Sequence, residues 1–438
     1  MSTTRRRFLR KAAAIAAPTI IPVSALGQGG RPAPSERVNM GFIGIGQQGI
    51  GVMEAFLNHA DVQGVAVCDV HDRHHRERPW GEGRALGREV GKEIIDKKYG
   101  NADCAAYIDF RELIARDDID AVMVATPDHW HAAVTLAALR SGKDVYCEKP
   151  VTHLFAEGQA VYRAAAEHKR VFLVGSQQRS DPRFRKAVEI VRNGVLGKLV
   201  RVEVGLPPGH KTAQGDTSIQ EPPKGLDYDR WCGPSPVLPY MNARHHRWWR
   251  WHTNYGGGNL MDWIGHHNDI AHWGLGVERS GPVRVEARGW TWPETEFYDT
   301  PVDYEVACDY EGGQQLLISS NVRKGTKWIG EDGWLWVDRG KTEASNPAWL
   351  ADDFVPGDWK AYRSPGHQRN LVDSIKSRKE TIAPAEIGHR SVTPGHLGWL
   401  SAKVGRPLKW DPAKEMILGD ADAQAKLMEV GYRPPWRL

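Results

Sequence analysis

The sequence predicts an α/β protein in which a doubly wound parallel sheet is followed by a second α/β domain with an open, largely antiparallel sheet. Between residues 38 and 176, short apolar runs alternate with helix-compatible segments, which is the pattern of parallel strands covered by helices. From residue 198 onward, strands with alternating polar and apolar residues follow, as in antiparallel sheets with one face in water. The 438 residues, 41% of them apolar, suffice for two or three domains.

The first unit of the predicted parallel sheet carries a glycine motif. An apolar strand at residues 38–43 runs into Gly44-Ile45-Gly46-Gln47-Gln48-Gly49, and a helix-compatible segment leads to a second strand, residues 62–68, followed by Asp69. This order is the signature of a dinucleotide-binding Rossmann unit: a strand, the G-x-G-x-x-G motif, a helix, and a second strand that ends in an acid. A glycine-rich turn without a ligand is the alternative, and it does not account for the helix and the acid.

Each position of the motif has a physical role in this interpretation. Gly44 permits the tight turn, Gly46 has no Cβ to block a pyrophosphate, and Gly49 lets helix and strand approach closely. The helix N-terminus offers unpaired N–H groups to the phosphates. Ile45 and Gln47, which stand between the glycines, are expected to contact the cofactor with them.

Asp69 indicates which dinucleotide is preferred. Its carboxylate would accept hydrogen bonds from a ribose diol and repel a 2′-phosphate, which favours NAD over NADP. His71 and Arg73, just beyond it, could soften that preference, so NADP is the alternative. The His- and Arg-rich segment from His71 to Arg88 allows metal binding as one interpretation, but a solvated charged helix or loop is expected and no chemistry is assigned to it.

Strands and helices alternate through the rest of the predicted nucleotide domain. Strands are expected at 120–125, 144–147 and 171–176, and helices at 132–141, 155–168 and 184–193. The first two of these strands end in polar motifs, Thr126-Pro127-Asp128-His129-Trp130-His131 and Glu148-Lys149-Pro150.

With these motifs the sequence resembles the glucose-fructose oxidoreductase/inositol dehydrogenase (Gfo/Idh/MocA) family. That family is marked by an N-terminal G-x-G-x-x-G, a T-P-x-x-x-H after the fourth strand, and E-K-P, and all three stand here. The resemblance extends through most of the chain. It implies a bound nicotinamide dinucleotide contacted by Thr126, His131, Glu148 and Lys149, with Gln177 as a cofactor or substrate contact.

Lys149 directly follows a strand that ends at the expected nucleotide crevice. Its ammonium group can therefore hydrogen-bond a substrate hydroxyl and favour the oxyanion as hydride leaves. An exposed surface lysine is the alternative, and the E-K-P context disfavours it.

Asp262 and His266 are the candidate acid–base pair. Four residues apart, they lie on one face if the segment is a helix, and the carboxylate can then fix the imidazole tautomer. The D-x-x-x-H-x-x-D spacing, completed by Asp269, resembles the catalytic helix of inositol dehydrogenase-like members, in which the histidine takes the hydroxyl proton; Asp269 itself is expected to be structural. A helix-surface pair, or a metal site completed by His267 or His272, is the alternative. Hydride transfer needs no metal, so no metal ligand is expected.

The segment from Pro207 to Trp251 is rich in Pro, Gly and aromatic residues, and it is expected to line or cover the substrate pocket. Trp248 and Trp249 from this segment, together with Arg179 and His267, are the expected substrate contacts. The 18 tryptophans of the chain allow two interpretations, core filling or a stacking surface for sugar rings. Around this segment, strands are expected at 200–204, 283–287, 304–309, 315–322 and 334–337, and helices at 367–379 and 386–404.

The N-terminus resembles a twin-arginine export signal. Residues 4–10, T-R-R-R-F-L-R, match S-R-R-x-F-L-K with conservative changes, and an alanine-rich stretch and Val23-Ser24-Ala25 follow as a cleavage site. A disordered basic N-terminus is the alternative.

The expected division of the chain is a signal peptide, a linker, a nucleotide domain, a substrate domain and a helical tail, at residues 1–25, 26–37, 38–195, 196–385 and 386–438. Since the periplasm has no pool of free NAD, an exported protein must carry its cofactor tightly bound.

Charge and cysteine content argue against several other classes of protein. The formal net charge is +4, but the first 25 residues supply +5, and the remainder of about −1 implies no basic surface for nucleic acid. The 5 cysteines are widely spaced without a C-x-x-C pair, which suggests neither a disulfide framework nor a zinc site. No apolar run approaches the roughly 18–20 residues that span a bilayer, so no transmembrane anchor is expected. The family resemblance implies a homo-oligomer formed through the second sheet.

The leading hypothesis is an exported, periplasmic enzyme that oxidises a secondary hydroxyl of a sugar, sugar derivative or glycoside with bound NAD. A cofactor that cannot leave the protein must be reoxidised while it is bound. The hydride would then return to a second sugar, or to the product after epimerisation or elimination, as in a redox-neutral glycosidase or lyase. A non-catalytic carbohydrate-binding protein that keeps NAD as a structural prop is the hypothesis from another class.

Overall fold

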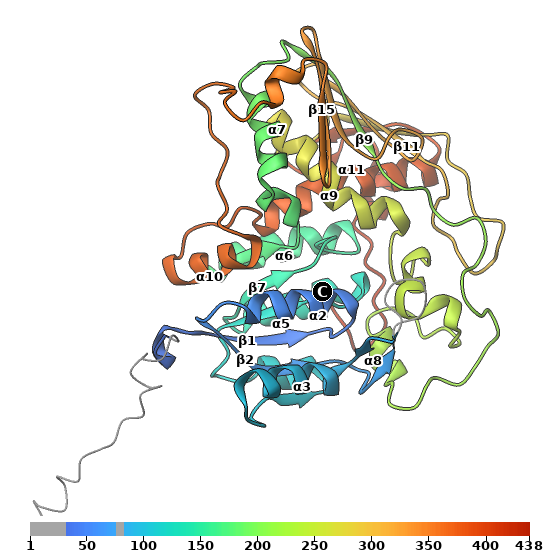
Figure 1. Ribbon diagram of the computed structural model, residues 1–438. Coiled ribbons are helices and arrows are strands. Elements are labelled where there is room, and N and C mark those ends of the chain that lie inside the picture. Colours follow the sequence, from blue (N-terminus) through green and yellow to red (C-terminus); the bar gives the residue numbers. More distant parts are fainter. Residues whose placement is uncertain (1–31, 76–82) are drawn as a thin grey trace, which may run out of the picture.

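The computed structural model describes residues 32–75 and 83–438. The expected signal peptide and residues 26–31 of the expected linker lie outside the described residues. Two sheets dominate the described part, a six-stranded parallel sheet near the N-terminus and a nine-stranded sheet formed by the C-terminal half. Figure 1 shows two helices, α9 and α11, lying between the large sheet and the nucleotide domain.

The six-stranded sheet has the order β5-β2-β1-β6-β7-β8, and every pair of neighbours is parallel. This is the doubly wound order, in which the strand sequence reverses between β1 and β6. Its strands are β1 Val38–Ile43, β2 Val62–Cys68, β5 Ala105–Tyr107, β6 Ala121–Val124, β7 Asp144–Cys147 and β8 Phe172–Val174. Its helices are α2 Gln47–Leu57, α3 Arg88–Tyr99, α4 Phe110–Ile114, α5 Asp128–Arg140, α6 Phe155–Glu167 and α7 Pro182–Arg192. The predicted Rossmann fold is therefore confirmed.

Burial on both faces explains why polar and apolar residues do not alternate along these strands. All residues of β6, β7 and β8 are buried, because helices cover both faces of a parallel sheet. Cys68 and Cys147 fill the sheet as small apolar side chains. One helix differs from the expectation: α5 begins at Asp128 and not at residue 132, because Pro127 occupies its N-cap position and the D-H-W-H sequence forms its first turn.

The nine-stranded sheet has the order β15-β14-β13-β9-β12-β11-β10-β16-β17 and contains one parallel pair, β9 with β12. The prediction of a largely antiparallel second sheet is confirmed. The strands are β9 Leu199–Gly205, β10 Arg284–Arg288, β11 Glu305–Asp309, β12 Gln315–Ser319, β13 Gly325–Gly330, β14 Gly333–Asp338, β15 Lys341–Ala344, β16 Leu408–Asp411 and β17 Met416–Ile417. The segment 386–438, expected to be helical, thus also extends the sheet through β16 and β17.

Helix α9, Gly258–Leu275, packs on β9 and β13 on one side and on α7 and α11 on others. Helix α11, Ala385–Val404, contacts α6 of the nucleotide domain as well as β10. These two helices therefore join the sheets into one body (Figure 1). This half also contains α10 His367–Ser377, α12 Ala421–Leu427 and a short 3-10 turn, η6 Pro347–Leu350.

The segment between β9 and α9 reaches over the carboxyl edge of the parallel sheet. It contains α8 Tyr228–Cys232 and two 3-10 turns, η4 Asn242–Arg244 and η5 His246–Trp251. Leu226 forms an isolated bridge with His71, which lies just after β2. We call this segment, residues 207–256, the insertion. Next to it lies a small hairpin of β3 His74–His75 and β4 Ala85–Leu86.

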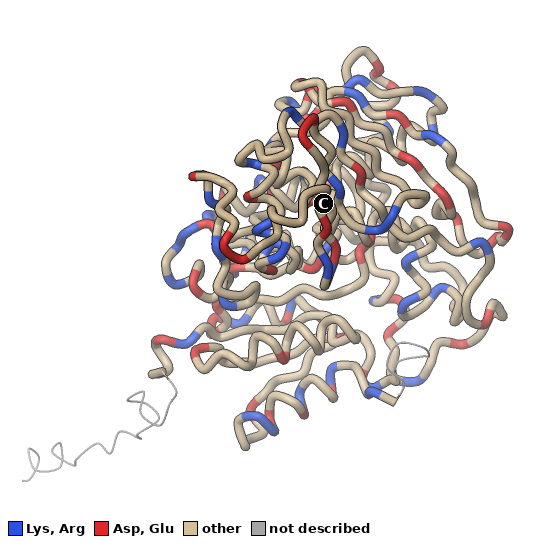
Figure 2. The backbone as a smooth tube through the Cα atoms, turned by 45° about the horizontal axis from the view of Figure 1, so that its top comes forward, with Lys and Arg blue, Asp and Glu red and all other residues tan. Residues whose placement is uncertain are grey.

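Figure 2 shows cationic and anionic residues interspersed along both halves of the described chain. Some of them pair across adjacent strands of the nine-stranded sheet, as Arg284 of β10 does with Asp309 of β11. None of the described helices is both long and apolar enough to cross a membrane.

Candidate active site

A cavity of about 1150 Å³ opens between the parallel sheet, the insertion and helix α9. It lies at the carboxyl ends of β1 and β6, where the strand order reverses and where doubly wound sheets bind ligands. Small-molecule sites typically measure ~300–1,000 Å³, so this cavity can hold a dinucleotide together with a substrate. A second hollow, lined by residues such as Arg37, Asp61 and Arg369, contains none of the motif residues.

The glycine motif has the shape that a dinucleotide needs. Gly44 has φ +87, and a Cβ there would lie 2.6 Å from the backbone of Ala125. A Cβ on Gly49 would lie 1.9 Å from the carbonyl oxygen of Gly44. A Cβ on Gly46 would meet no atom within 4 Å, so the space in front of the α2 N-terminus is open. Backbone N–H groups of that turn can therefore reach a pyrophosphate.

Gln47 and Ile45 differ in how they meet the cavity. Gln47 lines it, and its buried Oε1 has no hydrogen-bond partner among the described residues. The side chain of Ile45 is fully buried in the core and does not line the cavity. Ile45 acts instead through its backbone N–H, which donates to Asp69 Oδ2 at 2.7 Å.

Asp69 ties the glycine turn to the end of β2. Besides Ile45, the backbone N–H of His71 donates to Asp69 Oδ1 at 2.9 Å. The carboxyl group lines the cavity, and burial raises its pKa above the ordinary value. Each carboxylate oxygen accepts one of these two hydrogen bonds and keeps capacity to accept another, such as one from a hydroxyl group.

Glu148, Gln177, Thr126 and His131 all line the cavity. Glu148 Oε1 accepts hydrogen bonds from Gln177 Nε2 at 2.9 Å and from Tyr146 Oη at 2.8 Å. The ring nitrogens of His131 lie 2.7 Å from the carbonyl oxygen of Pro150 and 2.9 Å from that of Thr126. His131 therefore lies between the two motif loops, and a ring with one N–H can donate to one of the two carbonyl oxygens. Burial lowers its pKa to about 4, so the ring is neutral.

Lys149 reaches from the nucleotide domain to the first turns of α9. Its Nζ donates to Asp262 Oδ1 at 2.7 Å and to the backbone carbonyl of Asp262 at 2.9 Å. Gly265 allows this approach, since a Cβ there would lie 3.3 Å from the Cβ of Lys149. Arg250 of the insertion adds a second cation, with Nε 3.2 Å from Asp262 Oδ1. Burial acts to raise the pKa of Asp262, but Arg250 and Lys149 outweigh it and lower that pKa to about 2.

The expected pair between Asp262 and His266 is not formed. Both side chains line the cavity, as their spacing on α9 predicts, but the carboxylate is bound by the two cations. His266 Nδ1 is buried and has no hydrogen-bond partner in the described part of the chain. Burial, assisted by the charge of Lys149, holds the pKa of His266 well below its usual value, so the imidazole is neutral.

Asp128 is a functional candidate that the sequence interpretation did not select. It occupies the first turn of α5, lines the cavity, and has a buried Oδ2 without a partner among the described residues. Burial raises its pKa to about 7, and the nearby charge of Asp262 adds to this while Arg250 and Lys149 oppose it. An acid at the helix start that follows a cavity-facing strand end was the available signal.

Three expected substrate contacts do not reach the cavity. Arg179 is 2% exposed and forms a bidentate pair with Asp269, with distances of 2.6 and 2.8 Å, so both residues are structural. His267 is fully buried and stacks on Trp263. Trp248 packs in a separate cluster with Trp251 and Tyr298.

Trp249, the fourth expected contact, does line the cavity, next to Trp231 and Tyr255. Trp248 thus fills a core, whereas Trp249 stands at the cavity, where the stacking of a sugar ring stays a prediction. Trp249 also lies 4.5 Å from the guanidinium carbon of Arg250, a cation–π contact that helps to hold that arginine.

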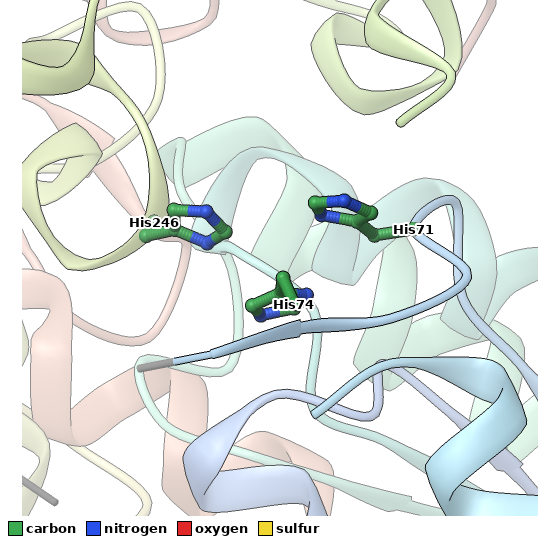
Figure 3. Close-up of side chains that lie close together, drawn as sticks. All are labelled: His71, His74 and His246. Carbon is green, nitrogen blue, oxygen red and sulfur yellow. The ribbon is translucent and has the colours of Figure 1, made fainter. Parts of the chain in front are cut away.

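Three histidines gather at the end of the cavity nearest Asp69. Figure 3 shows His71 and His74, which follow β2, facing His246 of the insertion. The ring of His74 lies 4.5 Å from that of His71 and 4.4 Å from that of His246, centroid to centroid. Burial lowers the pKa of all three, to about 4 for His74 and about 3 for His246.

This fold and cavity define an NAD-dependent enzyme built on a Rossmann domain. Residues 38–176 match the NAD-binding Rossmann fold of an oxidoreductase family, and residues 182–438 match the C-terminal α/β domain of the same family. The chain belongs to the Gfo/Idh/MocA oxidoreductase family.

Two groups of known proteins are similar to this chain. The α-N-acetylgalactosaminidase of Shewanella oneidensis is 27% identical over 267 residues, which is 54% of this chain and 55% of that protein. A glycosyl hydrolase family 109 protein of Shewanella baltica is 27% identical over the same shares. The chain thus spans about half the length of the curated relatives it matches.

Solved structures share the fold at lower identity. The aldose-aldose oxidoreductase of Caulobacter crescentus has a TM-score of 0.60 and 19% identity, covering 85% of this chain and 99% of its own. The WlbA dehydrogenase of Bordetella pertussis, in complex with NADH and UDP-GlcNAcA, has a TM-score of 0.59 and 18% identity, covering 86% and 99%.

Proposed function

We propose that this enzyme oxidises a secondary hydroxyl of a sugar, sugar derivative or glycoside with a tightly bound NAD. The observation that carries the proposal is the meeting of Lys149, Asp262 and His266 in the cavity that also holds the glycine motif. Structural neighbours described as an aldose-aldose oxidoreductase and a UDP-GlcNAcA-bound dehydrogenase support the substrate class.

Lys149 is the residue that polarises the substrate oxygen. An ammonium group has three donors, and two of them are bound by Asp262. The third is available for the hydroxyl, and it stabilises negative charge that develops on that oxygen. Asp262 fixes the position of the ammonium group, and Arg250 in turn holds Asp262, since both ion pairs are largely shielded from water.

His266 takes the hydroxyl proton. Its neutral imidazole can accept a proton, and it lies on the same helix as Asp262, one turn further along. NAD, when bound, supplies the hydride acceptor. Asp128, with a pKa of about 7, stands in the same cavity and can pass the proton onward near neutral pH.

A redox-neutral glycosidase is the second candidate, and the relatives named α-N-acetylgalactosaminidase and glycosyl hydrolase family 109 protein favour it. In this reaction one hydroxyl is oxidised transiently, which acidifies the neighbouring C–H bond. That carbon loses its proton and the β-substituent leaves with the bonding electron pair, which forms a carbon–carbon double bond. Water then adds to the double bond, and the hydride held on the cofactor returns to the carbonyl carbon. Lys149 and His266 serve the oxidation and the return of the hydride in both reactions.

The deciding experiment exposes the purified protein to a panel of sugars and glycosides and follows the absorbance of reduced nicotinamide. Oxidation produces that band, and Lys149→Met and His266→Gln abolish it, whereas the exposed control Lys409→Met does not. Release of an aglycone without net NADH supports the glycosidase. A protein that binds sugars on its tryptophans but changes no bound nicotinamide with any of them is a non-catalytic binder, and our proposal is then wrong.

We further propose that residues 1–25 direct twin-arginine export to the periplasm and that the nine-stranded sheet forms a homo-oligomer. The sequence T-R-R-R-F-L-R supports the first proposal. Val200, 54% exposed on β9, supports the second. Signal cleavage in a host with this pathway and light scattering of the mature protein test them.

A further inference from the structure

Three imidazole rings from two separate parts of the chain converge at one end of the cavity. His71 and His74 come from the loop after β2 and from β3, and His246 comes from η5 of the insertion. One ligand nitrogen of each ring lies within 4.8 Å of the others. Figure 3 shows the three side chains gathered together. All three residues line the cavity, while Lys149, Asp262 and His266 belong to another group of contacts.

Two nitrogen atoms of this cluster lack the partners that buried imidazoles normally have. Nδ1 of His71 and Nδ1 of His74 are buried and bind no group among the described residues. Buried polar atoms of folded proteins are almost always satisfied, and each exception calls for a ligand, an ion or a water. The ring of His71 hydrogen-bonds the backbone of Lys224, an interaction that in metal sites orients a histidine ligand.

The backbone of His246 is also unusual. It has φ +47, a left-handed conformation that is uncommon for residues other than glycine. Such strain persists only where the surroundings enforce it, and it concentrates at functional sites.

We propose that His71, His74 and His246 bind one divalent transition-metal ion of the Zn²⁺ class, which clamps the insertion onto the nucleotide domain. Three imidazole nitrogens suit Zn²⁺ and its neighbours in the first row, whereas Mg²⁺ and Ca²⁺ require oxygen ligands. Tetrahedral Zn²⁺ with bonds of about 2.0–2.1 Å needs nitrogens about 3.3 Å apart. Side-chain rotations that bring these atoms closer by about 1.5 Å are enough, since the rings already face one another.

The clamp has a clear location relative to the cofactor. His71 is two residues from Asp69, the expected ribose contact, so the ion sits at the adenosine end of the cavity. Two backbone hydrogen bonds already join the same segments, Asp72 N–H to Gly225 at 3.1 Å and Asp227 N–H to Val70 at 3.0 Å. A metal ion adds a stronger tie and restricts opening of the insertion, which slows release of a bound dinucleotide.

The experiment measures metal content and does not depend on turnover. Full-length protein is stripped with a chelator, reloaded with Zn²⁺ or Co²⁺, desalted and analysed by elemental mass spectrometry. We expect one ion per chain and, for Co²⁺, the visible spectrum of a tetrahedral site. His71→Ala and His246→Asn are the test variants; asparagine tolerates a positive φ, so His246→Asn removes the ligand without removing the fold.

His75→Ala is the matched control, because His75 neighbours His74 but is exposed and outside the cluster. The control retains the ion. Zn²⁺ affinity falls in His246→Asn by more than the ~10–100-fold typical of losing an outer-shell partner, and bound NAD is released faster. Wild-type protein that takes up no stoichiometric ion, or folded His246→Asn that binds it as tightly, overturns the proposal. Neither outcome bears on the proposed hydride transfer with Lys149 and His266, because that reaction is measured in a separate experiment.

Discussion

Lys149 Nζ lies 2.7 Å from Asp262 Oδ1, so the nucleotide domain and helix α9 are joined by an ion pair inside the cavity. The lysine follows β7 and the aspartate stands in the first turns of α9, so both halves of the chain contribute to the proposed catalytic group. Arg250 brings the insertion to the same carboxylate. Three parts of the chain therefore meet at one side chain.

Lys149→Met should reduce bound-NAD reduction strongly without unfolding the protein. The variant loses the donor to the substrate oxygen, and losing one such donor typically lowers the rate by ~10²–10³. Asp262 keeps Arg250 as a partner, so the fold is retained. Single-turnover absorbance with the preferred sugar gives the rate, and circular dichroism checks the fold. Wild-type rates in the folded variant contradict the role of Lys149.

Asp262→Asn should remove a pH-dependent part of the stability. The pKa of Asp262 is lowered from 3.8 to about 2, so its ionised form stabilises the folded state by about 2 kcal/mol above pH 4. That contribution is fully present above the unfolded pKa and is lost as the pH falls through 2. Urea unfolding of both proteins should show a gap at pH 5 that shrinks towards pH 2. A gap that does not change with pH argues against the ion pairs.

Asp128→Asn should alter the pH dependence near neutrality. A pKa raised to about 7 means that the folded state binds a proton that the unfolded state has released, so ionisation of Asp128 destabilises the protein as the pH rises from 4 through 7. The amide cannot ionise, and the variant should gain stability relative to wild type at pH 8 but not at pH 4. In a plot of the rate of NAD reduction against pH, the change near pH 7 should disappear. An unchanged profile excludes Asp128 from proton transfer.

Arg179→Met should destabilise the protein severely. It leaves Asp269, whose side chain is 1% exposed, without its bidentate partner, and breaking a buried pair typically costs ~3–5 kcal/mol. Arg183→Met, which breaks the exposed pair with Asp181, is the control and should cost about 1 kcal/mol or less. The urea concentrations at the midpoints of unfolding of the two variants and the wild type measure these losses of stability. Normal stability with weakened substrate binding would restore the substrate role that the sequence suggested for Arg179.

The parallel sheet could be predicted from the sequence because its information is local. β1, β2, β6 and β7 are apolar runs, and the glycine motif specifies the first turn. Strand β13 could not be predicted, since its sequence G-T-K-W-I-G has weak periodicity. Its conformation is imposed by pairing with β9, more than a hundred residues earlier, and with β14.

In the candidate site, too, local features could be predicted from the sequence and long-range contacts could not. Motifs placed Lys149, Asp262 and His266 together, because each is fixed by its own strand end or helix. The partner of Asp262 could not be predicted, since Arg250 belongs to an insertion whose path follows no periodic pattern. Burial, which decides the fate of Arg179 and His267, depends on contacts between distant elements.

Gly46→Ala and Gly49→Ala should separate cofactor binding from folding. Gly46 has φ −78 and ψ −172, which alanine adopts without strain, and its Cβ would meet no protein atom within 4 Å. The Gly46→Ala protein should therefore fold but lose bound NAD, because the methyl group occupies the pyrophosphate space. A Cβ on Gly49 would lie 1.9 Å from the carbonyl oxygen of Gly44, so Gly49→Ala should disrupt the turn and lower the melting temperature. Nucleotide released by heat, quantified by chromatography, and thermal unfolding measure the two effects. Full retention of NAD by Gly46→Ala would show that the dinucleotide lies elsewhere, since only a cofactor that passes over this turn is displaced by one methyl group.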